Sequence, residues 1–513
     1  MLLALASPWL MDYALAAWHR QKPLSSRQLQ THSPDSLRLL RQVCRQQGWQ
    51  LPELRLIADP APLCFSYGWL PRNTRIVISQ GILDQCSGDA LTALYTYELA
   101  RMVNGSLPVL SAVGLLLLLL HRSYQWLAQV GDGLTQPLIR NLLGVLASLV
   151  YGLFWLLRQL VLWLSRLGGS WGDRRSVALS QHPDQLAEGL LRFSAAIAAD
   201  LQQRGTLHPL HSSLEVLMPV SSRQAITPGS LLVKTPEHRT ELLTALVATE
   251  GLNPYRQWLR VNVSHLPLGE RLIWLHQQAL GRGQPGLEIN APSLTSVGQV
   301  SLPLLFRQKG PLAGLMVGGG LAMGLWFLGG IVNWLGWQRL SWLYQDPSIL
   351  TGGLWLGLGL GLLLRINMLF PDRQTPSSDR NTVADLLHHT PLLPVQGQPV
   401  TLRGTLRGQP GIGNWGCQDL YLDDPSGLVK LVNPVPLGSL QGWLQHQNHP
   451  LRWVGRQVTV TGWGRHGSGM HWVDIHQIQI DPRHRFITYG PIWATLISLG
   501  SSLIGIVTIF SGG

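Results

Sequence analysis

Charge is what this chain lacks most. Only 13% of its 513 residues are Asp, Glu, Lys or Arg, whereas about 25% is usual for a soluble domain. A deficit of this size excludes a single globule surrounded by water on all sides. Extended disorder is excluded as well, because disorder requires low hydrophobicity and 45% of these residues are hydrophobic.

Cysteine is also scarce. The four cysteines show no C-x-x-C spacing, so neither a disulfide framework nor a cysteine zinc site is predicted. The apolar N-terminus has no basic residues before it and contains Asp12, which argues against a secretory signal. We therefore expect residues 1–20 to form a short anchor or an interfacial helix.

Long apolar runs account for the missing charge. About 20 apolar residues cross the hydrocarbon core of a bilayer, and the runs that reach this length are Leu142 to Leu164, Pro311 to Gly336, Ser348 to Leu364 with an extension to Phe370, and Ile487 to Phe510. A further run, Leu107 to Leu120, is 14 residues long. It is either a buried core helix or, extended to Val130, a tilted span. We adopt the second interpretation, which predicts transmembrane hairpins at 107–166 and 311–370 and a C-terminal transmembrane helix at 487–510.

The basic residues support one orientation of these spans. The net charge is +12, and with the hairpins placed as above, arginines such as Arg101, Arg166, Arg174 and Arg307 lie near the membrane on the side of the large polar regions. The positive-inside rule puts that side in the cytoplasm. The sequence thus predicts a multi-pass integral membrane protein with membrane lipid as a partner and its large domains on the cytoplasmic side.

The first polar region contains a strand followed by a helix. Arg75, Ile76, Val77 and Ile78 are rich in β-branched side chains, and Gly81 follows them. Residues 87–89 offer N-cap candidates for a helix that ends near Asn104. This helix carries Tyr97, Glu98 and Arg101.

Several segments in this order resemble the HtpX-like membrane zinc metallopeptidases, which are family 48 of the metallopeptidases and relatives of the CAAX prenyl proteases. They are Pro62 to Gly68, Ile76 to Leu83, and a helix with Glu98 that leads into a membrane hairpin. Downstream, Ser264 to Pro267 followed by Glu270, Arg271 and Leu272 is similar to the family's H-P-P-x-x-x-R-I/L segment. The resemblance covers roughly residues 50–280. It implies a gluzincin-like α+β metallopeptidase domain in two parts, 21–106 and 167–283.

The resemblance also implies where the zinc ligands belong. In the family, an H-E-x-x-H helix holds Zn²⁺ through two His residues and uses the intervening Glu as general base. Glu98 matches this Glu, but Tyr97 and Arg101 occupy the His positions. The third ligand, the Glu of an E-x-x-x-D pattern, aligns with Gly169, and the Asp of that pattern aligns with Asp173. All three ligand positions are therefore degenerate.

The arginine at position 101 decides which chemistry we expect. A guanidinium stays protonated at physiological pH and repels a dication. We therefore expect no zinc, no other cofactor and no metal-activated water. Instead, we expect Arg101 to replace the metal as the partner of Glu98 in an ion pair. His265 is a further catalytic candidate because its motif lies near the active site in relatives, although a packing role is favoured here. The pair His208 and His211 is expected in a solvated loop.

The last polar region predicts a small β-barrel. After linkers at 284–310 and 371–391, residues 392–486 contain strand-like segments at Gln398 to Leu406, Leu420 to Leu422, Leu428 to Val432, Gly455 to Trp463 and Val473 to Ile480. This pattern is typical of an OB-like barrel. Arg403, Trp415, Trp443 and Trp463 would suit single-stranded nucleic acid, but the small basic excess favours a structural or protein-docking role.

Three functions follow. The favoured one is a catalytically inactive pseudopeptidase that binds protein partners or an extended polypeptide segment, with Arg75 to Ile78 as the edge strand that receives it. The second is an active zinc metalloendopeptidase in membrane protein quality control, whose ligands come from other histidines. The third is a membrane-tethered OB-type binding module. Nucleic acid is not an expected partner.

Overall fold

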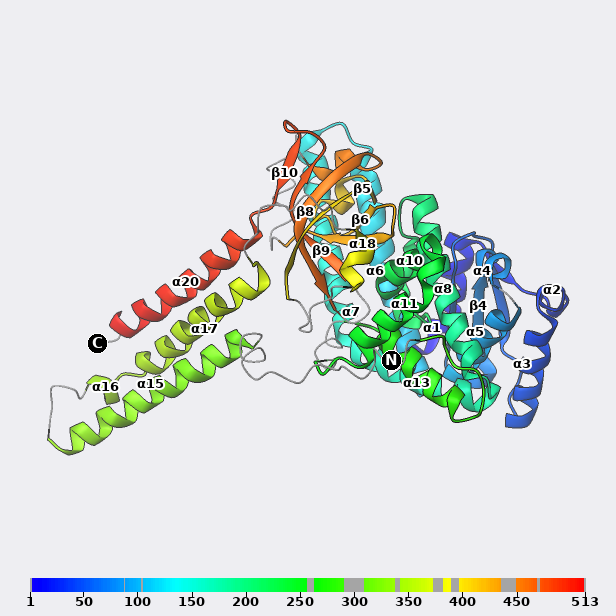
Figure 1. Cartoon of the computed structure of the whole chain (residues 1–513), viewed down its shortest axis with the longest axis horizontal. Helices are drawn as coiled ribbons and strands as arrows, with labels where there is room; N and C mark the ends of the chain where they lie inside the picture. The colour runs from blue at the N-terminus through cyan, green and yellow to red at the C-terminus, as the bar shows by residue number, and fades with distance from the viewer. Residues whose placement is uncertain are drawn as a thin grey trace.

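The computed structural model describes residues 2–86, 88–102, 105–255, 263–289, 309–336, 342–371, 382–388, 396–434, 449–467 and 471–511. Figure 1 shows an α/β domain built from the first half of the chain, a long helix pair, a β-barrel beside both, and a bundle of three long helices that projects away from them. The expected architecture of apolar helices, an α+β domain and a small barrel is present.

A four-stranded sheet lies at the centre of the α/β domain, in the order β1-β2-β4-β3. Its strands are β1 (Gln21–Pro23), β2 (Glu53–Ile57), β3 (Cys64–Gly68) and β4 (Thr74–Ser79). Strand β4 pairs in parallel with β2 and antiparallel with β3. The prediction that Arg75, Ile76, Val77 and Ile78 form an edge strand is therefore wrong. Both sides of β4 are paired, so no polypeptide can be added there.

Helices surround this sheet. They are α1 (Leu2–His19), α2 (Ser26–His32), α3 (Pro34–Gln47), α4 (Gln80–Gln85), α5 (Gly88–Arg101), α8 (Pro183–Arg204), α9 (Pro209–Ser213), α10 (Ser222–Lys234), α11 (Arg239–Leu246) and α13 (Leu268–Leu280). Every residue of α5 from Ala90 to Arg101 is buried. A helix that is buried all round lies in the core of its domain, so the side chains of α5 lie at its centre.

The long helix pair consists of α6 (Leu107–Asp132) and α7 (Pro137–Ser180). The apolar run predicted to end at Leu164 continues as helix for another sixteen residues, through the boundary that we expected at residue 166. This extension carries Gly169 and Asp173 back to α5.

The bundle consists of α15 (Gly310–Trp334), α17 (Ser348–Leu369) and α20 (Gly490–Ser511), with the short α16 (Trp342–Gln345) between the first two. Helices α15 and α17 approach closely, since a Cβ atom on Gly314 would lie 2.1 Å from the Gly357 carbonyl oxygen. Small residues that permit such contact are typical of membrane helices. In the described part of the chain, α6, α7, α15, α17 and α20 are long and apolar enough to cross a membrane.

The barrel is formed by β5 (Gln398–Gly408), β6 (Leu420–Asp423), β7 (Leu428–Val432), β8 (Gln457–His466) and β9 (His471–Gln479). Its strands close in the order β5-β6-β7-β9-β8, because β8 pairs with both β9 and β5. Only the β7–β9 pairing is parallel among the described barrel pairings. Strand β10 (Arg485–Ile487) extends from β9, and α18 (Val383–His388) packs on the barrel core.

Candidate active site

Helix α5 places Glu98 in the core next to strand β3. The Glu98 side chain is 0% exposed. Its Oε2 atom accepts a hydrogen bond of 2.5 Å from the Ser66 hydroxyl and lies 3.5 Å from Arg101 Nη1. Burial raises the pKa of Glu98, and the charge of Arg101 and the Ser66 hydrogen bond oppose that rise. The expected ion pair between Glu98 and Arg101 is thus present.

Arg101 has further partners that the sequence did not reveal. Its Nη1 atom donates to the carbonyl of Leu217, and its Nη2 atom donates to the carbonyl of Val216 over 3.3 Å. Both carbonyls belong to η2 (Glu215–Leu217), a short helical turn far along the chain. The guanidinium therefore links the former ligand position to a distant backbone segment as well as to Glu98.

The three positions aligned with zinc ligands meet where α5 crosses α7. A Cβ atom on Gly169 would lie 3.7 Å from the Tyr97 hydroxyl oxygen. A Cβ atom on Gly172 would lie 3.0 Å from the Tyr97 ring and 3.2 Å from Arg101 Cγ. Tyr97 thus contacts Gly169, and Tyr97 and Arg101 both contact Gly172 on the next turn of α7. Burial raises the pKa of Tyr97 to about 12, so its phenol is neutral and a poor ligand.

A second motif contact supports the same alignment. Asp173 accepts two hydrogen bonds from Arg271, at 2.9 Å from Nε and 2.6 Å from Nη2, and both side chains are buried. The two residues came from separate family motifs, the E-x-x-x-D pattern and the later H-P-P-x-x-x-R segment. Their bidentate contact across 98 positions of sequence is the geometry expected if both motifs were aligned correctly. It supports the alignment that puts Gly169, one turn before Asp173, at the third ligand position.

The His265 side chain is hydrogen-bonded to the backbone of Met218. Its Nε2 atom lies 2.6 Å from the Met218 carbonyl oxygen, and its Nδ1 atom lies 2.9 Å from the Ser264 hydroxyl. Because a carbonyl oxygen only accepts, Nε2 carries the proton and donates. Burial lowers the pKa of His265 to about 3, so the ring is neutral at physiological pH. These contacts favour the packing role.

Together these side chains hold four successive carbonyls of one buried segment, residues 216–219. Arg101 donates to Val216 and Leu217, His265 donates to Met218, and Arg271 Nη1 donates to Pro219 over 2.6 Å. Ser165 of α7 adds a hydrogen bond of 3.2 Å to the Val216 carbonyl. The apolar side chains of this segment pack in one cluster with Phe65 and Tyr67 of β3. The motif residues therefore bind the chain's own backbone, beside Glu98.

Zinc does not fit this arrangement. The three ligand positions supply a neutral phenol, a guanidinium and no side chain, whereas Zn²⁺ needs imidazole, thiolate or carboxylate donors. Glu98 Oε1 has no hydrogen-bond partner in the described part of the chain, but a single carboxylate oxygen does not make a zinc site. Among the described residues, no group of three or more His, Cys, Asp or Glu side chains could hold a metal ion.

The other histidine pair differs from its prediction. His208 and His211 are buried, and His208 caps α9 because its Nδ1 atom accepts a hydrogen bond from the Leu210 amide. The expectation of a solvated loop was wrong, because α9 folds back against the core. Their rings are 6.3 Å apart, and Asp59 Oδ2 lies 3.6 Å from His208 Nε2.

A buried glutamate lies on a core helix, next to motif positions from two later segments and two apolar helices. This arrangement is compatible with a domain of the membrane metallopeptidase class. The family model of peptidase family M48 matches residues 34–243. The chain is 25% identical over 228 residues to a Protease HtpX homolog from Syntrophobacter fumaroxidans, which covers 44% of this chain and 79% of that protein. It is 22% identical over 242 residues to Protease HtpX of Legionella pneumophila strain Corby, and this alignment covers 46% of this chain and 82% of that protein.

No solved structure matched the chain. The family match ends at residue 243, well before the barrel begins. Residues 34–243 therefore form an HtpX-like domain of peptidase family M48, and these relatives together with the long apolar helices indicate an integral membrane protein.

Proposed function

We propose that this protein is a pseudopeptidase, an HtpX-like scaffold that binds no zinc, hydrolyses no peptide bond and serves to hold protein partners at the membrane. One observation carries the proposal. Arg101 stands at the second ligand position, pairs with Glu98 and donates to the carbonyls of Val216 and Leu217. A permanent cation held in this way takes the place of the metal ion and repels any metal cation that approaches.

The consequence for catalysis is direct. Without a bound metal, nothing lowers the pKa of water from 15.7 toward about 7. Glu98 then has no activated nucleophile to deprotonate. Its Oε2 atom is already occupied by Ser66 and Arg101, and the segment 216–219 occupies the space beside it.

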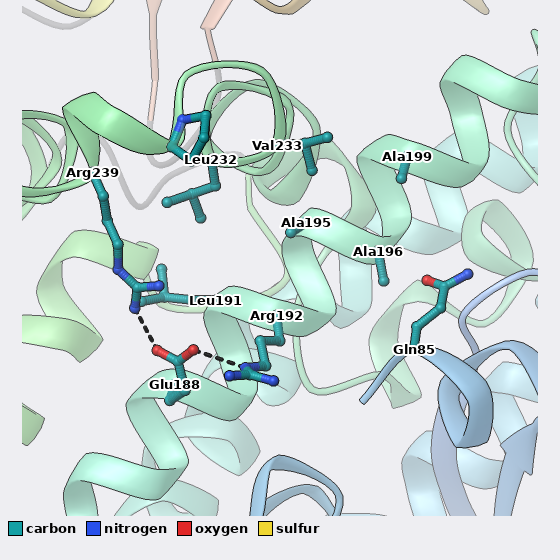
Figure 2. A pocket seen from close by; sticks show the side chains of 11 residues that line it. Gln85, Glu188, Leu191, Arg192, Ala195, Ala196, Ala199, Leu232, Val233 and Arg239 are labelled. Carbon is teal, nitrogen blue, oxygen red and sulfur yellow. Dashed lines mark hydrogen bonds and ion pairs between the residues drawn. The ribbon is translucent and has the colours of Figure 1, made fainter. Parts of the chain in front are cut away.

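An open hollow of the α/β domain lies elsewhere and has a volume of about 370 Å³. Figure 2 shows the side chains that line it, among them Ala195, Ala196 and Ala199 of α8 and Leu232 and Val233 of α10. At its rim, Glu188 bridges Arg192 and Arg239. It shares no lining residue with the Glu98 cluster. We therefore do not propose that a polypeptide binds at the Glu98 cluster.

The barrel is proposed to be an OB-type module with a structural or protein-docking role. The strand order β5-β6-β7-β9-β8 with a parallel β7–β9 pair supports this assignment. Nucleic acid is not proposed as a ligand, because the described tryptophans that would stack on bases are buried. Trp415 and Trp463 are buried, and Arg465 pairs with Asp474 at 2.5 Å. Trp443 lies outside the described residues.

We place the α/β domain and the barrel in the cytoplasm. The support is the basic residues that flank the bundle on their side, such as Arg307 and Lys309 just before α15. An active zinc metalloendopeptidase remains the alternative that a cleavage assay separates from this proposal.

The assay uses an unfolded protein substrate with the purified full chain in detergent, with and without a chelator. A Protease HtpX relative run in parallel is the positive control. We expect no cleavage by this chain in either condition, and no difference between the natural chain and Glu98→Gln. Chelator-sensitive cleavage that disappears in Glu98→Gln would overturn the proposal.

A further inference from the structure

The barrel holds the loop end of the α6–α7 pair. Tyr124 of α6 donates a hydrogen bond of 2.5 Å to the Gly413 carbonyl, and the Ile412 amide donates to Asp132 at the end of α6 over 3.0 Å. The Trp415 ring lies against Gly144 of α7, where a Cβ atom would be 2.6 Å from it. The barrel therefore contacts both helices near the turn that joins them.

The same barrel also binds the α/β domain directly. Lys234 Nζ of α10 lies 2.7 Å from Asp423 Oδ1, and the Leu428 amide donates to the Ser230 hydroxyl over 2.7 Å. The Gly408 amide donates to the Gly205 carbonyl over 2.8 Å. Figure 1 shows the barrel next to α6 and α10. Polar contacts of this length leave no room for a bilayer between the barrel and the α/β domain.

These two interfaces decide the position of the α6–α7 loop. The barrel and the α/β domain lie on one side of the membrane, and the loop end is bonded to the barrel. A hairpin that crossed a hydrocarbon core of about 30 Å would put its loop on the opposite side. The hairpin predicted at 107–166 therefore does not fit this structure as a transmembrane pair.

The exposed face of α7 has the form of a membrane-surface helix. Its large exposed side chains include Leu138, Leu142, Leu149, Leu153, Leu156, Leu160, Trp163 and Trp171. At a rise of about 1.5 Å per residue this stripe is about 50 Å long, well beyond the roughly 30 Å of a hydrocarbon core. The opposite face is protein-bound, since Arg158 turns inward to Glu215 at 2.7 Å. Such one-sided helices with interfacial Trp residues lie in the plane of a membrane.

We propose that α7 lies along the membrane surface, with its Leu and Trp stripe in the interfacial layer, and that α15, α17 and α20 alone cross the bilayer. The occupant of this face is lipid with anionic headgroups. The bundle belongs to the same chain and keeps the membrane within reach, and the exposed Arg174 and Arg175 lie just beyond Trp171. An odd number of spans puts the end of α20 on the side opposite the barrel.

The test is accessibility of single cysteines in sealed vesicles of known orientation, with the four native cysteines replaced. Three exposed positions are compared with a membrane-impermeant maleimide: Thr135 in the α6–α7 loop, Arg452 in the barrel, and Leu335, which is 63% exposed at the far end of α15. We expect Thr135→Cys to react from the same side as Arg452→Cys, and Leu335→Cys to react from the other side. Reaction of Thr135→Cys together with Leu335→Cys would overturn the proposal.

A second measurement identifies what covers the stripe. An environment-sensitive fluorophore on Leu160→Cys, at a residue that is 81% exposed, is compared in vesicles with and without brominated lipid, and with neutral or anionic headgroups. We expect quenching of at least twofold by brominated lipid and a stronger effect with anionic lipid, while the same label on Arg452→Cys is not quenched. No quenching at Leu160, or protection by a second copy of the chain shown by crosslinking, would refute lipid as the occupant.

Discussion

Replacement of Arg101 by Met tests whether this guanidinium anchors the former catalytic cluster. The change removes its hydrogen bonds to Val216 and Leu217 and leaves Glu98, which is 0% exposed, without a cation. Removal of one partner from a buried ion pair costs about 3–5 kcal/mol. We expect a loss of that size in the free energy of unfolding of the α/β domain.

The assay is pulse proteolysis of the full chain in detergent across a urea series, combined with hydrogen exchange at residues 216–220. Exchange at the amides of this segment other than Pro219 should accelerate in Arg101→Met, because the Leu217 carbonyl loses its Arg101 donor and the Val216 carbonyl keeps only Ser165. Arg101→Lys is the matched control. It keeps the charge but lacks the planar fork that reaches two carbonyls at once, so we expect a smaller loss and a partial increase in exchange.

A double-mutant cycle with Glu98→Gln separates the ion pair from the carbonyl contacts. Glu98→Gln keeps an acceptor for Ser66, and we expect it to cost less than Arg101→Met because Arg101 retains its carbonyl partners. The coupling energy between the two sites should be about 1–3 kcal/mol, as for residues in direct contact. An unchanged unfolding free energy in Arg101→Met, with unchanged exchange at 216–220, would refute the reasoning.

Further predictions concern the residues around this cluster. His265 has a folded pKa of about 3, below its unfolded value near 6.5, so its contribution to stability is present above about pH 6.5 and is lost as the pH falls. The loss should be about 2 kcal/mol at pH 5, and unfolding curves at pH 8 and pH 5 should show a smaller difference in His265→Gln. Asp173→Asn leaves Arg271 buried without its carboxylate and should cost about 3–5 kcal/mol in the same unfolding assay, whereas an effect below about 0.5 kcal/mol would contradict the buried pair. The triple substitution Tyr97→His, Arg101→His and Gly169→Glu restores all three family ligands. It should allow the protein to bind one zinc ion, and failure to bind would mean that the three positions do not converge on one site.

Local signals in the sequence predicted much of the architecture. The apolar runs located the long helices, and alternating side chains located the barrel strands, because both patterns reflect burial on a fixed period. The helix that carries Tyr97, Glu98 and Arg101 could also be predicted, whereas their assignment to zinc-ligand positions stays a prediction. The contact between Asp173 and Arg271 was not predicted, although the motifs that contain these two residues were recognised.

The remaining features depend on packing between distant segments and could not be predicted from the sequence. The interior position of β4 depends on its pairing with β2, which the composition of Arg75 to Ile78 does not encode. The extension of α7 past residue 166 was missed because Arg166, Arg174 and Arg175 end the apolar pattern, although the helix continues against α5. The four-carbonyl contact of residues 216–219 joins side chains from three separate regions, and only the apolar character of Val216 to Val220 hinted at burial.

The central claim is that an arginine has replaced the metal in an M48 domain. The most direct test is the zinc content of the purified full chain, measured by elemental mass spectrometry after equilibration with excess zinc and gel filtration, with a Protease HtpX relative as the control. The account predicts one zinc ion per chain for the control and none above background for this protein. Stoichiometric zinc in this protein, lost when Glu98 and His265 are replaced, would contradict it.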